Sequence, residues 1–220
     1  MKYFPVFLDL KGKLCVVVGG GQVAERKVLS LLKAGASVKV VSPELTKSLA
    51  RLRKDGRIDH RPRPFRSGDL RQAFLTIAAT DNRATNELVF RRAANQKIPV
   101  NVVDDPEHSS FIVPSLVDRG DLLLAISTSG QSPALARALR RKLQKDIGPE
   151  YASWVKLLGA LRAKILSLGF GQKRNQKIFR KLVQEDFLSL IRKKDYRGLE
   201  VRLRNMIGPG FSLKELRLSR

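Results

Sequence analysis

The stretch LCVVVGGGQVAERK, from Leu14 to Lys27, indicates the architecture of the chain. Lys13–Val18 is a short run of apolar, mostly β-branched residues, typical of a strand that is buried on both faces of a sheet. Three glycines follow, and Val23–Ala34 then carries apolar residues at helical spacing up to Gly35. The stretch therefore predicts a strand, a tight glycine turn and a helix.

The alternation of apolar runs and helical segments continues to residue 103. We expect further strands at Ser37–Val41, Arg57–Arg61, Phe74–Ala79 and Pro99–Val103. Helices are expected at Thr46–Lys54 and, capped by Asp81 or Asn82, through Ala94. Strands that alternate with helices across short loops predict a parallel, doubly wound sheet.

The pattern then changes. Ser110–Asp118 and Asp121–Thr128 are strand-like runs that a two-residue turn joins into a hairpin, and nearly every segment from Ser132 onward is helical. We therefore expect an α/β protein with an N-terminal Rossmann-like parallel sheet, a small β-hairpin segment and a C-terminal all-helical domain. The expected bounds of these three parts are 1–112, 113–148 and 149–220.

The chain of 220 residues carries 43 Lys and Arg against 20 Asp and Glu, a net charge of +23. Residues 1–131 hold 21 basic against 13 acidic residues and the remainder 22 against 7, so the excess lies mainly in the helical part, on amphipathic stretches such as Lys173–Leu190 and Lys193–Ile207. Such charge is typical of a solvated helical face or of a surface that binds nucleic acid, an anionic membrane or a polyanionic small molecule. With 6% aromatic residues and no recognised nucleic-acid module, nucleic acid is the weaker candidate.

The sequence also excludes several classes of protein. No apolar stretch approaches the length of a membrane span, and the N-terminus lacks the basic start and the cleavage site of a signal peptide. The single cysteine, Cys15, can form neither an internal disulfide nor a Cys-rich zinc site. We expect a cytoplasmic protein in which Cys15, inside the first strand, belongs to the core.

The glycine turn matches the dinucleotide-binding fingerprint as Gly19-x-Gly21-x-x-Ala24. Gly19 would allow the tight turn, Gly21 would let the backbone approach a pyrophosphate, and Ala24 would let helix and strand pack closely. The N-terminus of the following helix would offer free N–H groups to the phosphates. We therefore expect Gly19 and Gly21 to contact a dinucleotide.

The ribose of this cofactor would lie at the end of the second strand. An acid often binds its 2′-hydroxyl there, but Ser42 occupies the position, followed by Pro43 and Glu44. Either the Ser42 hydroxyl or the Glu44 carboxylate can bind the 2′-hydroxyl in place of an acid at position 42. Lys47 and Arg51 lie near enough in sequence to leave NADP open, although we expect NAD.

Reactive groups are expected where the strand at Pro99–Val103 ends. Asp104 and Asp105 lie at the sheet edge where ligands bind, although a plain turn before proline would use the same residues. We expect one of the two carboxylates to face the site. His108 is the candidate companion for proton chemistry. No Ser-His-Asp set, P-loop or HExxH motif is present, and we expect no resident metal.

The turn STSGQS, from Ser127 to Ser132, ends the hairpin and starts a helix. Ser132 followed by Pro133 suits a helix cap and first turn. The hydroxyls of Ser127, Thr128, Ser129 and Ser132, with the free amides of the turn, could also hold carboxylates of a substrate. The sequence leaves both roles open.

Together these residues resemble the precorrin-2 dehydrogenase family, which includes the N-terminal module of siroheme synthase. The matching pieces follow the order and spacing of the family over residues 1 to about 145 and extend less distinctly through the helical tail. They are Phe4–Phe7 with Leu10, Val18–Lys27, Ala78–Asp81, Asn101–Asp104, Phe111 with Pro114, Ile126–Pro133, and Ala136 with Arg137.

The resemblance implies a homodimeric enzyme that oxidises precorrin-2 to sirohydrochlorin with NAD in siroheme biosynthesis, and that in some members also inserts Fe²⁺. It implies dimerisation through residues 113–148, with C-terminal helices completing the site. Asp104 falls on the family's catalytic aspartate. Cofactor contacts are implied for Gln22, Val23, Pro43, Glu44, Thr80 and Asp81.

Partners follow from the same resemblance. Because the sequence ends at residue 220, we expect no methyltransferase domain and a separate uroporphyrinogen-III methyltransferase that supplies precorrin-2. The many carboxylates of precorrin-2 suit a protein with a basic C-terminal half. The alternative is a nucleotide-sensing binding protein whose basic helices contact nucleic acid.

Overall fold

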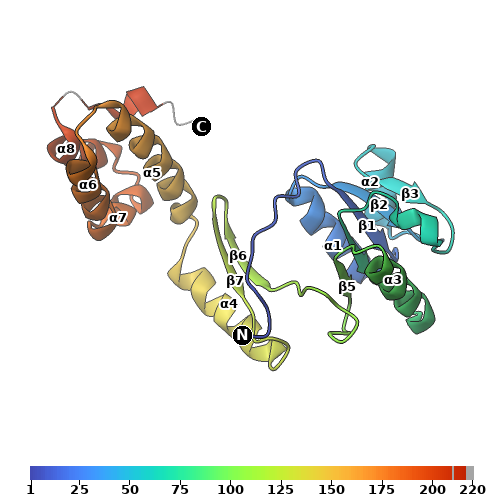
Figure 1. The fold of residues 1–220 in the computed structure, drawn as a ribbon. Coiled ribbons are helices and arrows are strands. Elements are labelled where there is room, and N and C mark those ends of the chain that lie inside the picture. Colours follow the sequence, from blue (N-terminus) through green and yellow to red (C-terminus); the bar gives the residue numbers. More distant parts are fainter. Residues whose placement is uncertain (210, 217–220) are drawn as a thin grey trace. The chain divides into compact units, whose positions relative to one another are not determined.

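The computed structural model describes residues 1–209 and 211–216 (Figure 1). The chain divides into two units, Met1–Val113 and the described residues from Pro114 onward. Gly210 and residues 217–220, which fall in the expected helical domain, lie outside the described residues. No helix in the described ranges is long and apolar enough to cross a membrane.

The first unit is built on a five-stranded parallel sheet in the order β3-β2-β1-β4-β5. Its strands are β1 (Leu14–Val18), β2 (Ser37–Val41), β3 (Asp59–Arg61), β4 (Leu75–Ala78) and β5 (Val100–Val102). The connecting helices are α1 (Gln22–Lys33), α2 (Lys47–Lys54), the 3₁₀ helix η1 (Ser67–Leu70) and α3 (Arg83–Asn95). The chain leaves β1 toward β2 on one side and later adds β4 on the other, so the strand order reverses beside β1. Ligands of doubly wound sheets bind at such a point.

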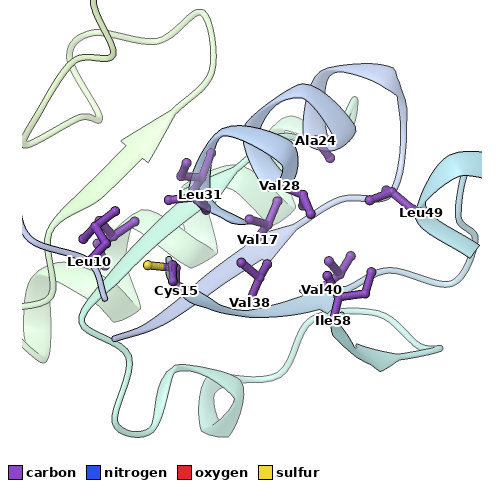
Figure 2. Packing of buried hydrophobic residues seen from close by; sticks show 13 residues of the cluster. Leu10, Cys15, Val17, Ala24, Val28, Leu31, Val38, Val40, Leu49 and Ile58 are labelled. Carbon is purple, nitrogen blue, oxygen red and sulfur yellow. The ribbon is translucent and has the colours of Figure 1, made fainter. Parts of the chain in front are cut away.

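Both faces of this sheet are buried, as the apolar strands predicted. On the face that Figure 2 shows, Cys15 and Val17 of β1 share a buried cluster with Val28 of α1. Val16 and Val18 belong to a second cluster on the opposite face. Burial raises the pKa of the Cys15 thiol to about 11, so the thiol stays protonated at neutral pH. Cys15 is therefore a core residue, as expected.

The second unit begins with the antiparallel hairpin of β6 (Ser115–Arg119) and β7 (Leu122–Ile126), followed by α4 (Pro133–Asp146). Arg119 ties the hairpin to this helix. Its Nε donates to the carbonyl of Ile147 at 2.7 Å and its Nη2 to that of Gln144 at 2.9 Å, which satisfies carbonyls at the C-terminal end of α4.

Helices make up the rest of the second unit. They are α5 (Glu150–Ser167), α6 (Gln172–Gln184), α7 (Phe187–Arg192), α8 (Tyr196–Ile207) and the 3₁₀ helix η2 (Leu213–Leu216). They enclose a core of their own, in which the rings of Trp154 and Phe187 stack with centroids 5.2 Å apart. The predicted architecture of parallel sheet, hairpin and helical region is confirmed.

One expected strand was wrong in detail, and one amphipathic stretch is divided between two helices. The first hairpin strand starts at Ser115 and not at Ser110, because the preceding segment folds back on β5: the amide N of Val100 donates to the Ser110 hydroxyl at 2.8 Å. The amphipathic stretch Lys173–Leu190 is two helices, because Asp186 starts α7 by accepting a hydrogen bond from the amide N of Ser189 at 3.0 Å.

Candidate functional site

The glycine turn lies where the strand order reverses, between the carboxyl ends of β1 and β4. Gly19 has a φ of +120°, and a Cβ there would collide with the carbonyl of Ala79, just after β4. A Cβ at Gly20 would collide with the carbonyl of Glu44 and lie 2.8 Å from Oγ of Ser42. Both positions require glycine because the turn passes close to the loops that follow β4 and β2.

At Gly21, neither a close contact nor the backbone conformation within the protein requires a glycine. A Cβ there would meet no atom within 4 Å, and the backbone is extended, with φ −80° and ψ −174°. Gly21 is the N-cap of α1, and no side chain in the described part of the chain caps this helix, which opens with Gln22 and Val23. Ala24 is fully buried and lets α1 pack on the sheet. Open space before an uncapped helix fits a pyrophosphate, so these residues suit the expected dinucleotide.

The loop after β2 is fixed against this turn. The amide N of Thr46 donates to the carbonyl of Gly20 at 3.0 Å, and Oγ1 of Thr46 donates to Oε2 of Glu25 at 2.5 Å. Pro43 and Glu44 are exposed on the same loop. This is the position at which the ribose of a dinucleotide is bound in folds of this type.

Thr80 and Asp81 follow β4, on the other side of the turn. Oγ1 of Thr80 donates to Oδ1 of Asn86 at 2.7 Å, and Nδ2 of Asn86 donates back to the Thr80 carbonyl at 2.9 Å. Asn82 caps α3 by accepting from the amide N of Thr85 at 2.8 Å. Of the two expected caps the structure therefore uses Asn82, and Asp81 stays exposed.

A pocket of about 450 Å³ opens at the ends of β4 and β5. Its lining consists of Asp81, Arg83, Asn86, Glu87, Val102, Val103, Asp104, Asp105 and His108. Asp104 is exposed and turns the chain with a φ of +60°, in the left-handed region that few non-glycine residues other than Asn, Asp and His adopt. It forms no hydrogen bond or ion pair with any other described residue. The Asp104 carboxylate is thus available to a ligand.

Lys27 of α1 belongs to the surroundings of Asp104, although it was not among the expected site residues. Burial lowers the pKa of the Lys27 ammonium, the charge of Arg26 lowers it further, and the Asp104 carboxylate acts to raise it. The two charges therefore interact across the turn. The only sequence signal for this was that Lys27 is the last residue of Val18–Lys27, one of the stretches that resemble the family.

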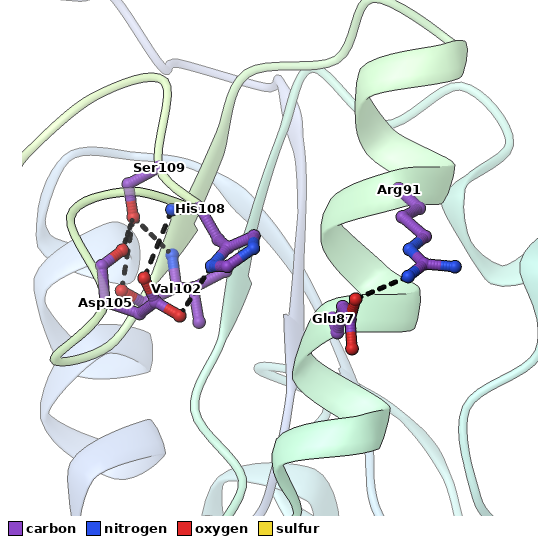
Figure 3. A network of polar contacts seen from close by, with 6 residues as sticks. All are labelled: Glu87, Arg91, Val102, Asp105, His108 and Ser109. Atoms are coloured by element: carbon purple, nitrogen blue, oxygen red, sulfur yellow. Dashed lines mark hydrogen bonds and ion pairs between the residues drawn. The ribbon is translucent and has the colours of Figure 1, made fainter.

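Asp105 has a partner of its own (Figure 3). Its Oδ2 lies 2.8 Å from Nδ1 of His108, and its Oδ1 accepts from the backbone N of His108 at 3.2 Å. Partial burial acts to raise the pKa of Asp105, but the hydrogen bonds from His108 outweigh it and hold the pKa below its ordinary 3.8. Both adjacent carboxylates line the pocket, whereas we expected only one to face the site. They differ in that Asp105 is paired and Asp104 is not.

The serine-rich turn belongs to the second unit. Oγ of Ser127 accepts from the amide N of Ser129 at 3.0 Å, and Oγ1 of Thr128 accepts from that of Ser132, also at 3.0 Å. Oγ of Ser132 accepts from the amide N of Leu135 at 3.2 Å and caps α4, as expected. Three of the four candidate hydroxyls thus serve the turn itself, whereas the Ser129 hydroxyl forms no hydrogen bond to the rest of the described chain.

No metal centre is formed in the described part of the chain: its His, Cys, Asp and Glu side chains nowhere gather in a group of three or more that could hold an ion.

Comparison with known proteins adds independent findings. The NAD(P)-binding family model NAD_binding_7 matches residues 6–115, and the model named sirohaem biosynthesis protein central matches residues 119–145. A siroheme synthase of Methylobacillus flagellatus is 44% identical over 193 residues, which are 86% of this chain and 41% of that protein. A siroheme synthase of Thioalkalivibrio sulfidiphilus is 46% identical over 165 residues, which are 75% of this chain and 34% of that protein.

One solved structure is also similar. The protein named SirC, precorrin-2 dehydrogenase, matches with a TM-score of 0.73 and 28% sequence identity, over 86% of this chain and 92% of that chain. By contrast, the chain spans only about two fifths of the length of the siroheme synthase from Methylobacillus. The glycine turn, the strand order and these similarities agree, and the chain belongs to the NAD(P)-binding family of siroheme biosynthesis that includes precorrin-2 dehydrogenase and the N-terminal module of siroheme synthase.

Proposed function

We propose that this protein is an NAD-dependent precorrin-2 dehydrogenase, which oxidises precorrin-2 to sirohydrochlorin in siroheme biosynthesis. The observation that carries the proposal is the unpaired Asp104 carboxylate, which lines a polar pocket at the same sheet edge as the glycine turn. The similarity to SirC, named a precorrin-2 dehydrogenase, over most of both chains supports the same reaction.

The glycine turn and the loops after β2 and β4 would hold the cofactor. The proposed contacts are Gly19, Gly21, Gln22, Val23, Pro43, Glu44, Thr80 and Asp81. When bound, NAD⁺ supplies the acceptor for the hydride that precorrin-2 loses. We propose NAD and not NADP because the exposed Glu44 carboxylate, on the loop that would meet the ribose, would repel a 2′-phosphate. NADP turnover compared between the wild type and Glu44→Gln tests this preference.

Asp104 would act as the general base. Its carboxylate is exposed and would accept the proton that precorrin-2 releases from a pyrrole nitrogen as it is oxidised. We propose that Fe²⁺ enters sirohydrochlorin as a second substrate, with Asp104 accepting the pyrrole protons that the metal displaces. The carboxylate suits both steps because no described residue forms a hydrogen bond or an ion pair with it.

The serine-rich turn would bind carboxylates of the tetrapyrrole. The proposed contacts are Ser127, Thr128, Ser129 and Ser132, of which only Ser129 has a hydroxyl without a hydrogen bond in the described chain. The basic residues of the second unit would add electrostatic attraction for a polycarboxylate.

A homodimer through the hairpin segment is part of the proposal. On the hairpin face opposite the buried Val117, Leu116 of β6 and Leu123 of β7 are each 41% exposed. A two-stranded sheet with an open apolar face is marginally stable, so a second copy would cover it. Leu116→Asp should therefore shift sedimentation velocity toward the monomer, and an unchanged dimer would exclude this face as the interface.

Two expectations stay predictions. A separate uroporphyrinogen-III methyltransferase as the source of precorrin-2 can be tested by reconstituting the pathway from the two purified proteins. Location in the cytoplasm can be tested by cell fractionation.

The test of the function is anaerobic turnover of enzymatically generated precorrin-2, followed by sirohydrochlorin absorbance with NAD, with NADP, and then with Fe²⁺ or Co²⁺. We expect NAD-dependent oxidation, and metal insertion above the protein-free rate. Asp104→Ala should lower kcat at least about 100-fold at unchanged NAD affinity, whereas Asp59→Ala, which removes an exposed carboxylate on β3, should change neither.

Lack of turnover with either nucleotide would contradict the proposal. Salt-sensitive binding of duplex DNA would then favour a nucleotide-sensing protein whose basic helices contact nucleic acid.

A further inference from the structure

Asp105 and His108 form a pair to which the proposed reaction assigns no role. The carboxylate of Asp105 binds both Nδ1 and the backbone N of His108, at 2.8 and 3.2 Å. The ring of Phe90, on α3, meets the imidazole edge to face, with centroids 5.0 Å apart and planes at 83°. The imidazole is therefore held by a hydrogen bond at Nδ1 (Figure 3) and by an aromatic contact from a different element.

This arrangement decides which ring nitrogen carries the hydrogen. Because the pKa of Asp105 lies below its ordinary value, the carboxylate is ionised at neutral pH and can only accept hydrogen bonds. Nδ1 of His108 must then donate, and in the neutral imidazole the lone pair is left on Nε2. No described residue donates to Nε2, so this nitrogen is free to accept a proton.

His108 lines the same pocket as Asp104, with Asp81, Arg83 and Glu87 as the other charged groups beside Asp105. Its side chain is 33% exposed, so it is in contact with water. One pocket thus brings together an unpaired carboxylate and an imidazole in a fixed orientation and tautomer. Such a pair, with the imidazole oriented by a second carboxylate, is suited to moving a proton.

We propose that Asp105 is a positioning residue that holds His108 as the second proton acceptor of the Asp104 pocket. The proposal rests on the proposed oxidation of precorrin-2. That oxidation removes two hydrogens from the macrocycle, a hydride that passes to NAD⁺ and one proton from a pyrrole nitrogen. Asp104 accepts this proton, and Nε2 of His108 takes it over through water and releases it to solvent. One proton leaves per turnover, and Asp104 is ionised again.

The first test determines the tautomer of His108 by spectroscopy and requires no enzymatic turnover. The chain has two histidines, so a long-range ¹H–¹⁵N spectrum of the labelled protein contains two imidazoles. His108 should be protonated at Nδ1, whereas His60, whose Nε2 lies 2.9 Å from the carbonyl of Ser42, should be protonated at Nε2 and serves as the internal reference.

In Asp105→Asn, the amide oxygen can still accept from the backbone N of His108, which turns the amide NH₂ toward Nδ1. Nδ1 must then accept, so we expect His108 to change to the Nε2-protonated tautomer while His60 stays unchanged. Asp59→Asn, at an exposed ion pair with Arg61, is the matched control and should change neither histidine. An unchanged His108 tautomer in Asp105→Asn would overturn the positioning role.

The second test measures kinetics. Asp105→Asn should lower kcat about 10- to 100-fold with unchanged KM and NAD affinity. His108→Ala should lower it about 100-fold, and added imidazole should restore part of the rate, which a merely structural role of His108 would not allow. An unchanged kcat in Asp105→Asn, or no rescue by imidazole, would overturn the relay. A wild-type protein that does not oxidise precorrin-2 would overturn the proposed function and the relay together, while the tautomer still decides whether Asp105 positions His108.

Discussion

Among the turns that lead from a strand into a helix, Gly19–Gly21 before α1 and Ser127–Ser132 before α4 differ in how the N–H groups of the helix N-terminus are satisfied. No described side chain caps α1, and the space in front of Gly21 is open. At α4, Ser132 caps the helix and its own N–H is taken by Thr128. A helix end attracts an anion through N–H groups that are free. The first turn is therefore prepared for a phosphate, whereas in the second the N–H groups of Ser132 and Leu135 are already bonded to side chains of the turn.

The difference bears on the proposed role of the serine-rich turn. Both turns are candidate anion sites by sequence, since both place small or hydroxylated residues before a helix. Carboxylates of a substrate could reach the amides of Ser132 and Leu135 only by displacing their hydrogen bonds to Thr128 and Ser132. The Ser129 hydroxyl needs no such displacement. If this turn binds substrate, Ser129 is the residue through which it should do so first.

The largest expected effect is on stability at Gly19. Gly19→Ala should destabilise the first unit by about 3 kcal/mol or more, because its φ of +120° is strained for any side chain and the new Cβ would collide with the Ala79 carbonyl. Gly130→Ala, in the serine-rich turn, should lose only about 1 kcal/mol, because its φ of +87° is strained but a Cβ there meets nothing within 4 Å. Urea unfolding measures both. Equal losses of stability in the two variants would mean that the collision of a Cβ at Gly19 with the Ala79 carbonyl adds nothing to the cost of the positive φ.

Gly21→Ala should separate binding from folding. Its free energy of unfolding should change by less than about 0.5 kcal/mol, because the site is sterically open and φ is negative. NAD affinity, measured by calorimetry, should fall about 10-fold or more, equivalent to about 1.4 kcal/mol, because the Cβ would occupy the approach of the pyrophosphate. Gly130→Ala is the control that should leave NAD affinity unchanged. Unaltered affinity in Gly21→Ala would place the pyrophosphate elsewhere.

Much of the first unit could be predicted because its strands are short apolar runs between clear breakers. The expected strands at Lys13–Val18 and Ser37–Val41 correspond to β1 and β2 within one residue, and the fingerprint located the turn between β1 and α1. Such signals are local: periodicity, glycine and proline act within a few residues. The structure therefore agrees with the sequence where the determinants are adjacent in the chain.

The rest of the site depends on contacts that no local pattern encodes. The interaction of Lys27 with Asp104 joins residues far apart in sequence, through the strand order of the sheet. The pairing of Asp105 with His108 depends on the chain turning at Asp104 with a positive φ, which β propensity does not predict. The expected strand at Ser110 failed for a similar reason, because the Ser110 hydroxyl bonds the edge of β5.

The smallest expected effects test the second turn. Ser132→Ala should lower the stability of the second unit by about 1 kcal/mol through loss of the α4 cap, with NAD affinity unchanged. Ser129→Ala is its matched partner and should change stability by less than about 0.5 kcal/mol, because the hydroxyl forms no hydrogen bond within the described chain. Thermal unfolding and the KM for precorrin-2 distinguish two cases. A raised KM in Ser129→Ala at unchanged stability would show that the turn binds substrate although it is satisfied from within. An unchanged KM in both variants would restrict the role of the turn to starting α4.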